Sequence, residues 1–190
     1  MPDLHADVST EKMLDFAAAY PLAWIVPFAD PSAALLMPVL IETDEAGKPT
    51  SLLGHLPRAH EVTGCLANDA RIAVLFLGPN AYIPPAWIRK KGWAPTWNFV
   101  SLKVTATAQA DTGLTRQAVE SLVAHMEGAA GWSVAEMGER YESLLKGIIG
   151  FRASIETVVP RFKLGRDETS ESWTDIKQGL TGHPLADWME

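Results

Sequence analysis

Cysteine is nearly absent from this chain of 190 residues, and several other features are missing altogether. The single cysteine, Cys65, excludes a disulfide within the chain and argues against a cysteine zinc site; we expect it to be a small buried hydrophobic residue. No run of about 18 apolar residues occurs, which excludes a membrane-spanning helix. Residues 1–7 lack a basic stretch followed by an apolar one, so we expect no signal peptide and, by default, a cytoplasmic location.

Positive charge is also scarce. The chain has 16 Lys and Arg against 23 Asp and Glu, a net charge of −7, which opposes binding of a polyanion such as DNA over the whole surface. The best local basic run is Arg89-Lys90-Lys91, which fits a solvated turn as well. Residues 161–166 place three cations beside a strand end, which indicates an anion site or, alternatively, a solvated strand end. We find no helix-turn-helix with a basic recognition helix, so direct DNA binding is doubtful.

No common catalytic signature occurs. The chain has no G-x-S-x-G, no H-E-x-x-H, no P-loop and no G-x-G-x-x-G, and its five histidines lack the spacing of metal ligands. We therefore predict neither catalytic residues nor a metal site from motifs alone.

What the chain does have is a series of strand patterns. The stretch 71–77 is nearly all apolar, which predicts a strand buried on both faces. The stretch 98–108 alternates, with Val100 and Leu102 among the residues that point to one side. Because the strands lie close in sequence and no strand–helix–strand alternation occurs, we predict an antiparallel sheet closed into a small barrel with helices outside. The other expected strands cover 22–28, 35–42, 51–56 and 151–158, the last continued by 161–164.

Helices are predicted near both ends and in the middle. Apolar residues at helical spacing predict helices over 9–19 and 115–127, and the capping box Ser133-Val-Ala-Glu136 begins another that runs to about 146. We predict one domain, residues 1–190, with a helical insertion at about 112–147 and a C-terminal helix at about 170–180.

The most distinctive segment is aromatic and rich in proline. Residues 77–87 and 94–99 hold two tryptophans, a tyrosine and several prolines between two strands. Proline fixes φ, so we expect a stiff loop. Such a loop suits a flat ligand because little side-chain entropy is lost on binding. Alternatively, the aromatic side chains fill a barrel mouth or a dimer seam.

Four sequence blocks carry a family resemblance. They are residues 52–59 (Leu-Leu-Gly-His-Leu-Pro-Arg-Ala), residues 77–87, residues 95–99, and residues 147–151 with 162–164. In order and spacing, over about residues 50–180, they resemble the PaiB family of FMN-binding negative transcriptional regulators, which are split-barrel flavoproteins related to pyridoxamine 5'-phosphate oxidase. The resemblance implies an α+β, mainly β fold built on a six-stranded antiparallel split barrel, and a homodimer with FMN at the interface.

The resemblance also implies an FMN site. A phosphate dianion needs cations and hydroxyl donors, the isoalloxazine needs an apolar slot with stacking faces, and the polar ring edge needs hydrogen bonds. The residues predicted for these three roles are Arg58, Lys163 and Thr96 for the phosphate, Tyr82, Trp87 and Trp97 for the ring, and His55, Asn80 and Asn98 for the edge.

Departures from the family pattern keep other functions open. The family usually has His where Asn80 stands, Asn where His60 stands, and K-L-S-Q-N-R where residues 163–168 read K-L-G-R-D-E. Arg166 is an alternative ligand for the phosphate. Besides an FMN-binding regulator, the sequence allows a flavin-dependent oxidoreductase acting on a small molecule, with His55 as its most obvious base. It also allows a dimeric module that has lost FMN and binds another small-molecule ligand.

Overall fold

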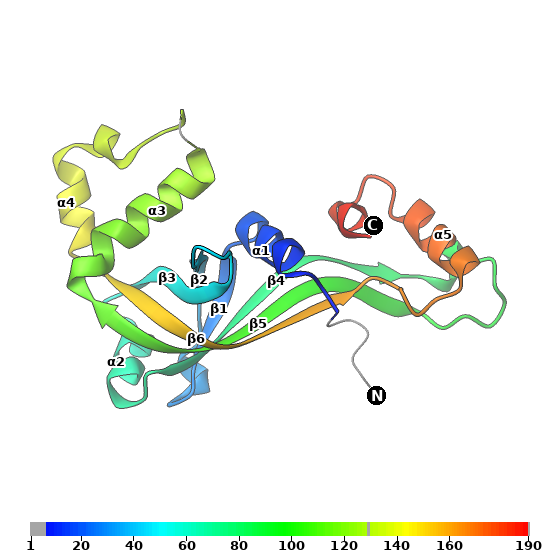
Figure 1. The fold of residues 1–190 in the computed structure, drawn as a ribbon, viewed down its shortest axis with the longest axis horizontal. Coiled ribbons are helices and arrows are strands. Elements are labelled where there is room, and N and C mark those ends of the chain that lie inside the picture. The colour runs from blue at the N-terminus through cyan, green and yellow to red at the C-terminus, as the bar shows by residue number, and fades with distance from the viewer. Residues whose placement is uncertain (1–6, 129, 190) are drawn as a thin grey trace. The chain divides into compact units, whose positions relative to one another are not determined.

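The computed structural model describes residues 7–128 and 130–189 and contains a closed antiparallel barrel of six strands in the order β1-β2-β3-β6-β5-β4 (Figure 1). This confirms the predicted mainly β barrel. Residues 1–6, on which the expectation of no signal peptide largely rests, lie outside the described part. The strands are β1 (Leu22–Pro27), β2 (Leu35–Thr43), β3 (Pro49–Pro57), β4 (Arg71–Ile83), β5 (Thr96–Asp111) and β6 (Ile148–Lys163).

Helices connect and follow these strands. No helix in the described residues is both long and apolar enough to cross a membrane. The α-helices are α1 (Thr10–Ala19), α2 (Glu61–Asn68), α3 (Thr115–Glu127), α4 (Glu139–Leu145) and α5 (Ser170–Gly179), and the short 3-10 helices are η1 (Pro31–Ala33), η2 (Pro85–Trp87), η3 (Thr112–Leu114), η4 (Val134–Met137) and η5 (Pro184–Trp188).

The chain divides into two compact units. The barrel unit comprises Ala17–Phe76 and Lys103–Val158. The other comprises Met1–Phe16, Leu77–Leu102 and Val159–Glu190; we call it the aromatic unit because it contains many of the tryptophans. Strands β4, β5 and β6 contribute residues to both units.

Alternation along the strands builds the core of the barrel unit. On β5, Val104 and Ala106 are buried, whereas Thr105 points outward and shares a hydrogen bond of 2.6 Å with the hydroxyl of Thr157 on β6. The two-residue period confirms the alternation predicted for this strand. Apolar burial on the inward side supplies most of the stabilisation, at about 25 cal/mol per Å².

A glycine lets α3 begin close to the barrel. A Cβ at Gly150 on β6 would lie 2.5 Å from the backbone carbon of Leu114, so only glycine fits there. The amide of Gly150 donates a hydrogen bond of 3.0 Å to the hydroxyl of Thr115, the first residue of α3. The same residue pairs with His55 on β3, so α3 begins next to this histidine's position in the sheet.

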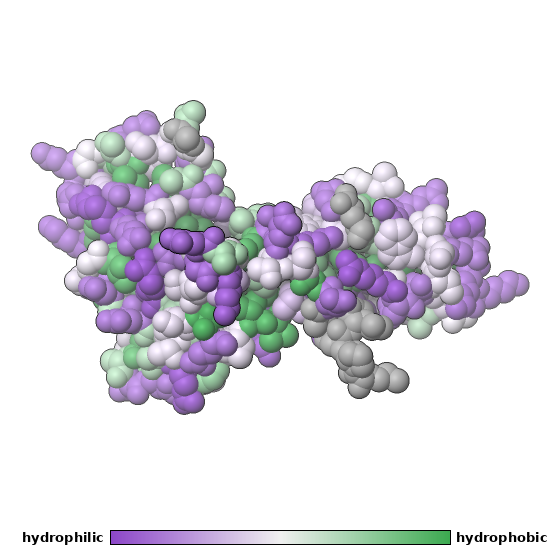
Figure 2. All heavy atoms as spheres, viewed as in Figure 1, coloured by the Kyte–Doolittle hydropathy of each residue, from purple (hydrophilic) through white to green (hydrophobic). Residues whose placement is uncertain are grey.

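The strand predicted over 71–77 differs from expectation in two ways. It is not buried on both faces, because Leu75 and Leu77 are 38% and 58% exposed. It also continues as β4 to Ile83, so residues 77–83 are strand rather than loop. An apolar run cannot reveal whether its outward face is covered. Figure 2 shows hydrophobic residues, in green, exposed among hydrophilic ones on the barrel unit.

Local helix predictions also need correction. Helix α2 was not predicted; it has eight residues, and its N-cap His60 accepts a hydrogen bond of 3.2 Å from the backbone amide of Val62. Cys65 lies on this helix and is half-buried rather than buried. The helix predicted from Ser133 is interrupted at Gly138, whose φ of 56° is available mainly to glycine, so η4 and α4 are separate. A short helix depends on its packing, which local propensity does not encode.

The aromatic unit has a core of its own. The ring of Phe16 on α1 meets those of Phe162 and Trp188 edge to face, at centroid distances of 5.5 and 5.7 Å. A Cβ at Gly78 on β4 would lie 2.3 Å from the Phe16 ring, so the glycine makes room for it. These contacts tie α1, β4, β6 and η5 together within the unit.

Candidate functional site

Two exposed aromatic rings lie on neighbouring strands of the aromatic unit. Tyr82 on β4 and Trp97 on β5 have ring centroids 6.0 Å apart, with planes at 61°. About half of each side chain is exposed, 47% and 53% respectively. Large aromatic side chains that remain this accessible on a strand offer a flat apolar surface to a ligand or a partner. The structure therefore brings together two of the three residues predicted for the isoalloxazine.

Two cations of β6 contact β5 at the end that carries Trp97. The ammonium of Lys163, on β6, donates a hydrogen bond of 2.5 Å to the hydroxyl of Thr96, the chain neighbour of Trp97. An ammonium carries three donors, so Lys163 keeps two for an anion. Arg161, two residues earlier on β6, lies over the ring of Phe99 at 5.6 Å from its centroid. We call the surface formed by Tyr82, Trp97, Phe99, Arg161 and Lys163 the aromatic-cation face.

Asn98 points the other way. Successive residues of a strand face opposite sides of the sheet, so Asn98 and Trp97 do not share a surface. Asn98 is fully buried, and neither polar atom of its amide has a hydrogen-bond partner in the described part of the chain. Its nearest surroundings include Gly165: a Cβ there would lie 3.5 Å from the Asn98 amide nitrogen and 3.7 Å from Trp173.

The remaining predicted residues of the aromatic unit make contacts of their own. The Asn80 amide nitrogen donates a hydrogen bond of 3.2 Å to the carbonyl oxygen of Gly78. The ring of Trp87, in η2, lies against α5, because a Cβ at Gly179 would be 2.3 Å from it. Trp87 therefore supports the packing of α5, with 36% of its side chain exposed.

His55 and Arg58 belong to the barrel unit. His55 is partly buried on β3, its Nδ1 has no partner among the described residues, and burial lowers the pKa of its imidazole. The ring is thus neutral at neutral pH. Arg58 is exposed just before α2, and its backbone amide donates to the carbonyl of Gly147 at 3.0 Å. Arg58 forms no ion pair with Glu61, the carboxylate nearest to it along the chain.

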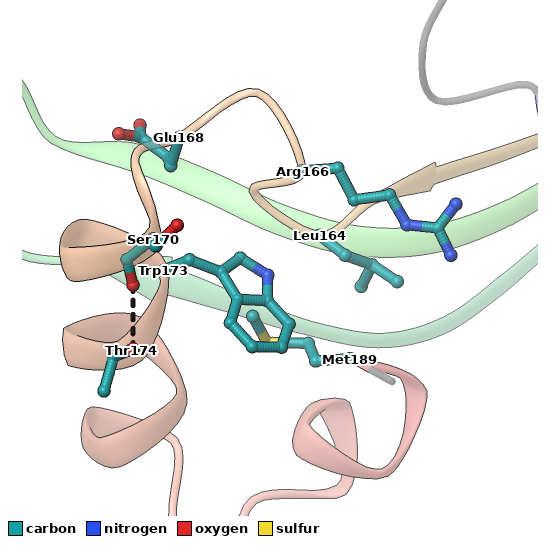
Figure 3. Close-up of a pocket in the computed structure, with 7 residues that line it drawn as sticks. All are labelled: Leu164, Arg166, Glu168, Ser170, Trp173, Thr174 and Met189. Carbon is teal, nitrogen blue, oxygen red and sulfur yellow. Dashed lines mark hydrogen bonds between the residues drawn. The ribbon is translucent and has the colours of Figure 1, made fainter.

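The aromatic unit also contains a cavity of about 480 Å³ that the sequence did not indicate (Figure 3). Its apolar wall is made by Leu164, Trp173 and Met189. Figure 3 shows the side chains of Arg166 and Glu168 pointing in opposite directions from the loop before α5. The residues that line it are Leu164, Arg166, Glu168, Ser170, Trp173, Thr174 and Met189.

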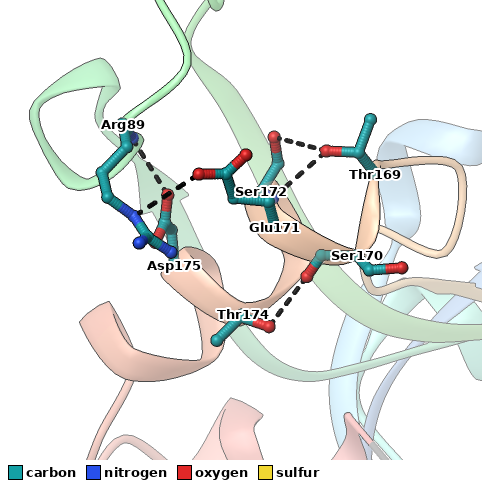
Figure 4. A network of polar contacts seen from close by, with 7 residues as sticks. All are labelled: Arg89, Thr169, Ser170, Glu171, Ser172, Thr174 and Asp175. Atoms are coloured by element: carbon teal, nitrogen blue, oxygen red, sulfur yellow. Dashed lines mark hydrogen bonds and ion pairs between the residues drawn. The ribbon is translucent and has the colours of Figure 1, made fainter.

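An ion pair positions α5 within this unit (Figure 4). Asp175, buried on α5, accepts hydrogen bonds from the backbone amide of Arg89 at 2.9 Å and from its Nε at 2.8 Å. The Arg89 guanidinium holds the pKa of the Asp175 carboxyl below its usual range. The first cation of the run considered for DNA therefore has a structural role, which the sequence signal alone could not separate from a solvated turn.

Comparisons with known proteins agree with this architecture. The Protease synthase and sporulation protein PAI 2 of Bacillus subtilis (strain 168) is 25% identical over 163 residues, covering 74% of this chain and 76% of that protein. The FAD and heme binding protein from Mycobacterium smegmatis aligns with a TM-score of 0.58 at 14% identity, covering 90% of this chain and 78% of that one. The flavocytochrome Anf3 from Azotobacter vinelandii aligns with a TM-score of 0.54 at 13% identity, covering 81% and 67%.

At these identities the structural likeness shows the fold alone. The family assignment comes from the sequence: a family model described as "Putative FMN-binding domain" matches residues 1–157, which is most of the chain. Together with the relative from Bacillus subtilis, this confirms the resemblance to the PaiB family. The chain belongs to this family of FMN-binding domains.

Proposed function

We propose that this protein binds FMN on the aromatic-cation face. The observation that carries the proposal is the exposed Tyr82–Trp97 pair, together with the Lys163 ammonium bonded to Thr96 at the start of β5. An isoalloxazine is flat and apolar on its faces, so it gains from stacking on exposed rings, and its phosphate gains from a cation with free donors. Family membership supports the same ligand. FMN, when bound, supplies hydride or single-electron transfer.

The residues of this face have separate tasks. Tyr82 and Trp97 provide the ring surface, and Lys163 binds the phosphate while Thr96 orients its ammonium. Arg161, held over Phe99, adds positive charge to the same face of an otherwise acidic protein. The assignments of His55, Arg58, Asn80, Trp87 and Asn98 to FMN stay predictions from the sequence.

Flavin titration tests the proposal. We expect the wild-type protein to quench flavin fluorescence on addition to FMN. Trp97→Ala should weaken FMN binding about tenfold, since an aromatic contact of this kind contributes about 1 kcal/mol or more. Lys163→Gln should weaken it roughly tenfold to a hundredfold, because hydrogen bonds to charged groups contribute about 1.5–3 kcal/mol.

The matched control is Trp132→Ala, which removes an exposed tryptophan from the barrel unit and should leave FMN binding unchanged. Absence of quenching at tens of micromolar protein, roughly the weak end of cofactor affinities, would exclude a flavin site. Equal binding by wild type, Trp97→Ala and Lys163→Gln would show that FMN, if bound, lies elsewhere.

We also propose that the protein is a homodimer, as the family resemblance implies. Trp24 on β1 pairs with Leu36 on β2 and with Leu75 on β4, so these side chains share one outward face of the barrel. Leu22, two residues from Trp24, extends it, and all four are exposed. A contiguous apolar patch on a barrel surface is typical of an interface between subunits. A second copy of the chain is the occupant that this face fits.

Trp24→Glu tests that interface. A carboxylate in the centre of an apolar contact loses its hydration without gaining a partner, so the variant should run as a monomer where the wild type runs as a dimer. Size-exclusion chromatography with light scattering measures this directly. Met126→Glu, at an exposed apolar position near the end of α3, serves as the control and should remain dimeric. A monomeric wild type, or a dimeric Trp24→Glu, would contradict the proposed interface.

We propose that regulation by this protein acts through a ligand or a partner protein. Support comes from the net charge of −7 and from Arg89, which is engaged by Asp175. Both disfavour a continuous phosphate-binding surface. A cytoplasmic location is part of the same proposal.

A further inference from the structure

We propose that the cavity lined by Leu164, Arg166 and Trp173 is a second ligand site, for a small flat aromatic carboxylate. It goes beyond the proposed FMN site and does not depend on it, because none of its lining residues belongs to the aromatic-cation face. The cavity of about 480 Å³ lies within the range typical of small-molecule sites.

The walls of the cavity favour a flat apolar body. Leu164 and Met189 line the cavity but are each 1% exposed, so they close its floor and leave the half-buried Trp173 as the main apolar surface for a ligand. Trp173 adds an aromatic surface, and its position is fixed because the ammonium of Lys177 lies 4.7 Å from its ring centroid. An aromatic ring of one or two cycles would replace water against the Trp173 ring.

Arg166 favours an anion. Its Nη1 donates one hydrogen bond, 3.3 Å long, to the backbone carbonyl of Asp7, and within the described residues no carboxylate pairs with it. A guanidinium has five donors in a planar fork that matches a carboxylate. Most of this capacity is therefore available to a ligand, whereas the other arginine near α5, Arg89, is already paired with Asp175.

The other polar groups do not oppose this assignment. The carboxylate of Glu168 accepts a hydrogen bond of 3.0 Å from Trp93 Nε1, and Figure 3 shows it directed away from Arg166. The hydroxyl of Thr174 donates a hydrogen bond of 2.7 Å to the backbone carbonyl oxygen of Ser170. The first backbone amides of α5, at Ser170 and Glu171, are not used within the helix and add donors at this end. The ligand class that matches is thus one carboxylate on an aromatic ring.

Calorimetric titration with benzoate and 1-naphthoate tests the proposal, with 1-naphthylmethanol as the neutral counterpart. We expect 1-naphthoate to bind the wild-type protein at least about tenfold more tightly than the alcohol, since a charge-assisted contact distinguishes them. Arg166→Gln should remove that preference, and Arg166→Lys should retain part of it, because lysine keeps the charge without the fork. Arg140→Gln, at an exposed arginine of α4 in the barrel unit, is the matched control and should leave 1-naphthoate binding unchanged.

FMN titration of the same variants separates this site from the flavin site. Unchanged FMN affinity in Arg166→Gln, together with lost 1-naphthoate preference, supports two sites. Loss of FMN binding in Arg166→Gln would assign the cavity to the flavin phosphate and overturn the proposal. Two further results would also overturn it: no heat of binding with either acid at millimolar concentration, or 1-naphthoate binding that Arg166→Gln does not affect.

Discussion

Phe16→Ala should cost the protein about 3–5 kcal/mol of folding free energy, the range for removing a fully buried phenylalanine. Phe16 is 0% exposed and contacts the rings of Phe162 and Trp188 edge to face. Truncation would leave a cavity between α1, β6 and η5 in the aromatic unit. Gly78 cannot fill it, because that residue has no side chain and its backbone is fixed in β4.

Urea denaturation followed by tryptophan fluorescence measures this loss. Phe28→Ala is the matched control: Phe28 is 45% exposed and its main contact is the Arg71 guanidinium, 5.6 Å from the ring centroid. Its removal should cost about 0.5–1 kcal/mol, as for an exposed cation–π contact. Equal losses in the two variants would mean that the Phe16 cluster does not carry the stability of this unit.

The sequence predicted the parts of the fold that repeat along a strand or helix. The alternation predicted for β5 is confirmed, because Val104 and the other inward residues of this strand are buried inside the barrel. The C-terminal helix was correct because the amphipathic spacing of α5 matches its buried residues, Ile176 among them. Both patterns are set by one face packing on one core, and such patterns are visible in a single sequence.

The predictions were wrong where residues far apart in the sequence determine the burial or the stability of an element. The outward face of β4 was predicted to be buried because Leu75 and Leu77 are apolar, but both side chains are exposed. Helix α2 was missed because its eight residues include Gly64, a poor helix former, and depend on the cap provided by His60. The aromatic residues of the segment 77–87 indicated a ligand site in a loop. The structure shows instead that residues 77–83 belong to strand β4.

The sequence suggested residues for the candidate site but could not show how they lie relative to one another. Thr96 and Lys163 are 67 residues apart and meet through their side chains, whereas their shared role at a phosphate stays a prediction. Trp97 and Asn98, adjacent in sequence, lie on opposite faces of β5 because consecutive strand residues always do. The cavity beside Arg166 was not foreseen, since it depends on how α5 and η5 pack around Trp173 and Met189.

Asn98→Leu should stabilise the FMN-free protein by about 1–3 kcal/mol, the cost of leaving buried polar groups unsatisfied. Both polar atoms of the Asn98 amide lack partners in the described part of the chain, and the side chain is fully buried. Leucine has nearly the same shape and carries no polar atoms, so it removes the desolvation cost without opening a cavity. Urea denaturation measures the gain. Asn80→Leu is the control; it breaks the bond to the Gly78 carbonyl and should bring no gain.

The same variant decides which face of the sheet holds the flavin. If FMN lies on the aromatic-cation face, Asn98→Leu leaves its affinity unchanged, because Asn98 points away from Trp97. A large loss of FMN affinity, together with the gain in stability, would instead mean that the polar edge of the flavin reaches the buried amide. The unsatisfied donor and acceptor of Asn98 would then be explained as groups that the cofactor completes, and Trp97→Ala would have little effect on binding. Because the two faces predict opposite outcomes for Asn98→Leu and Trp97→Ala, one pair of titrations distinguishes them.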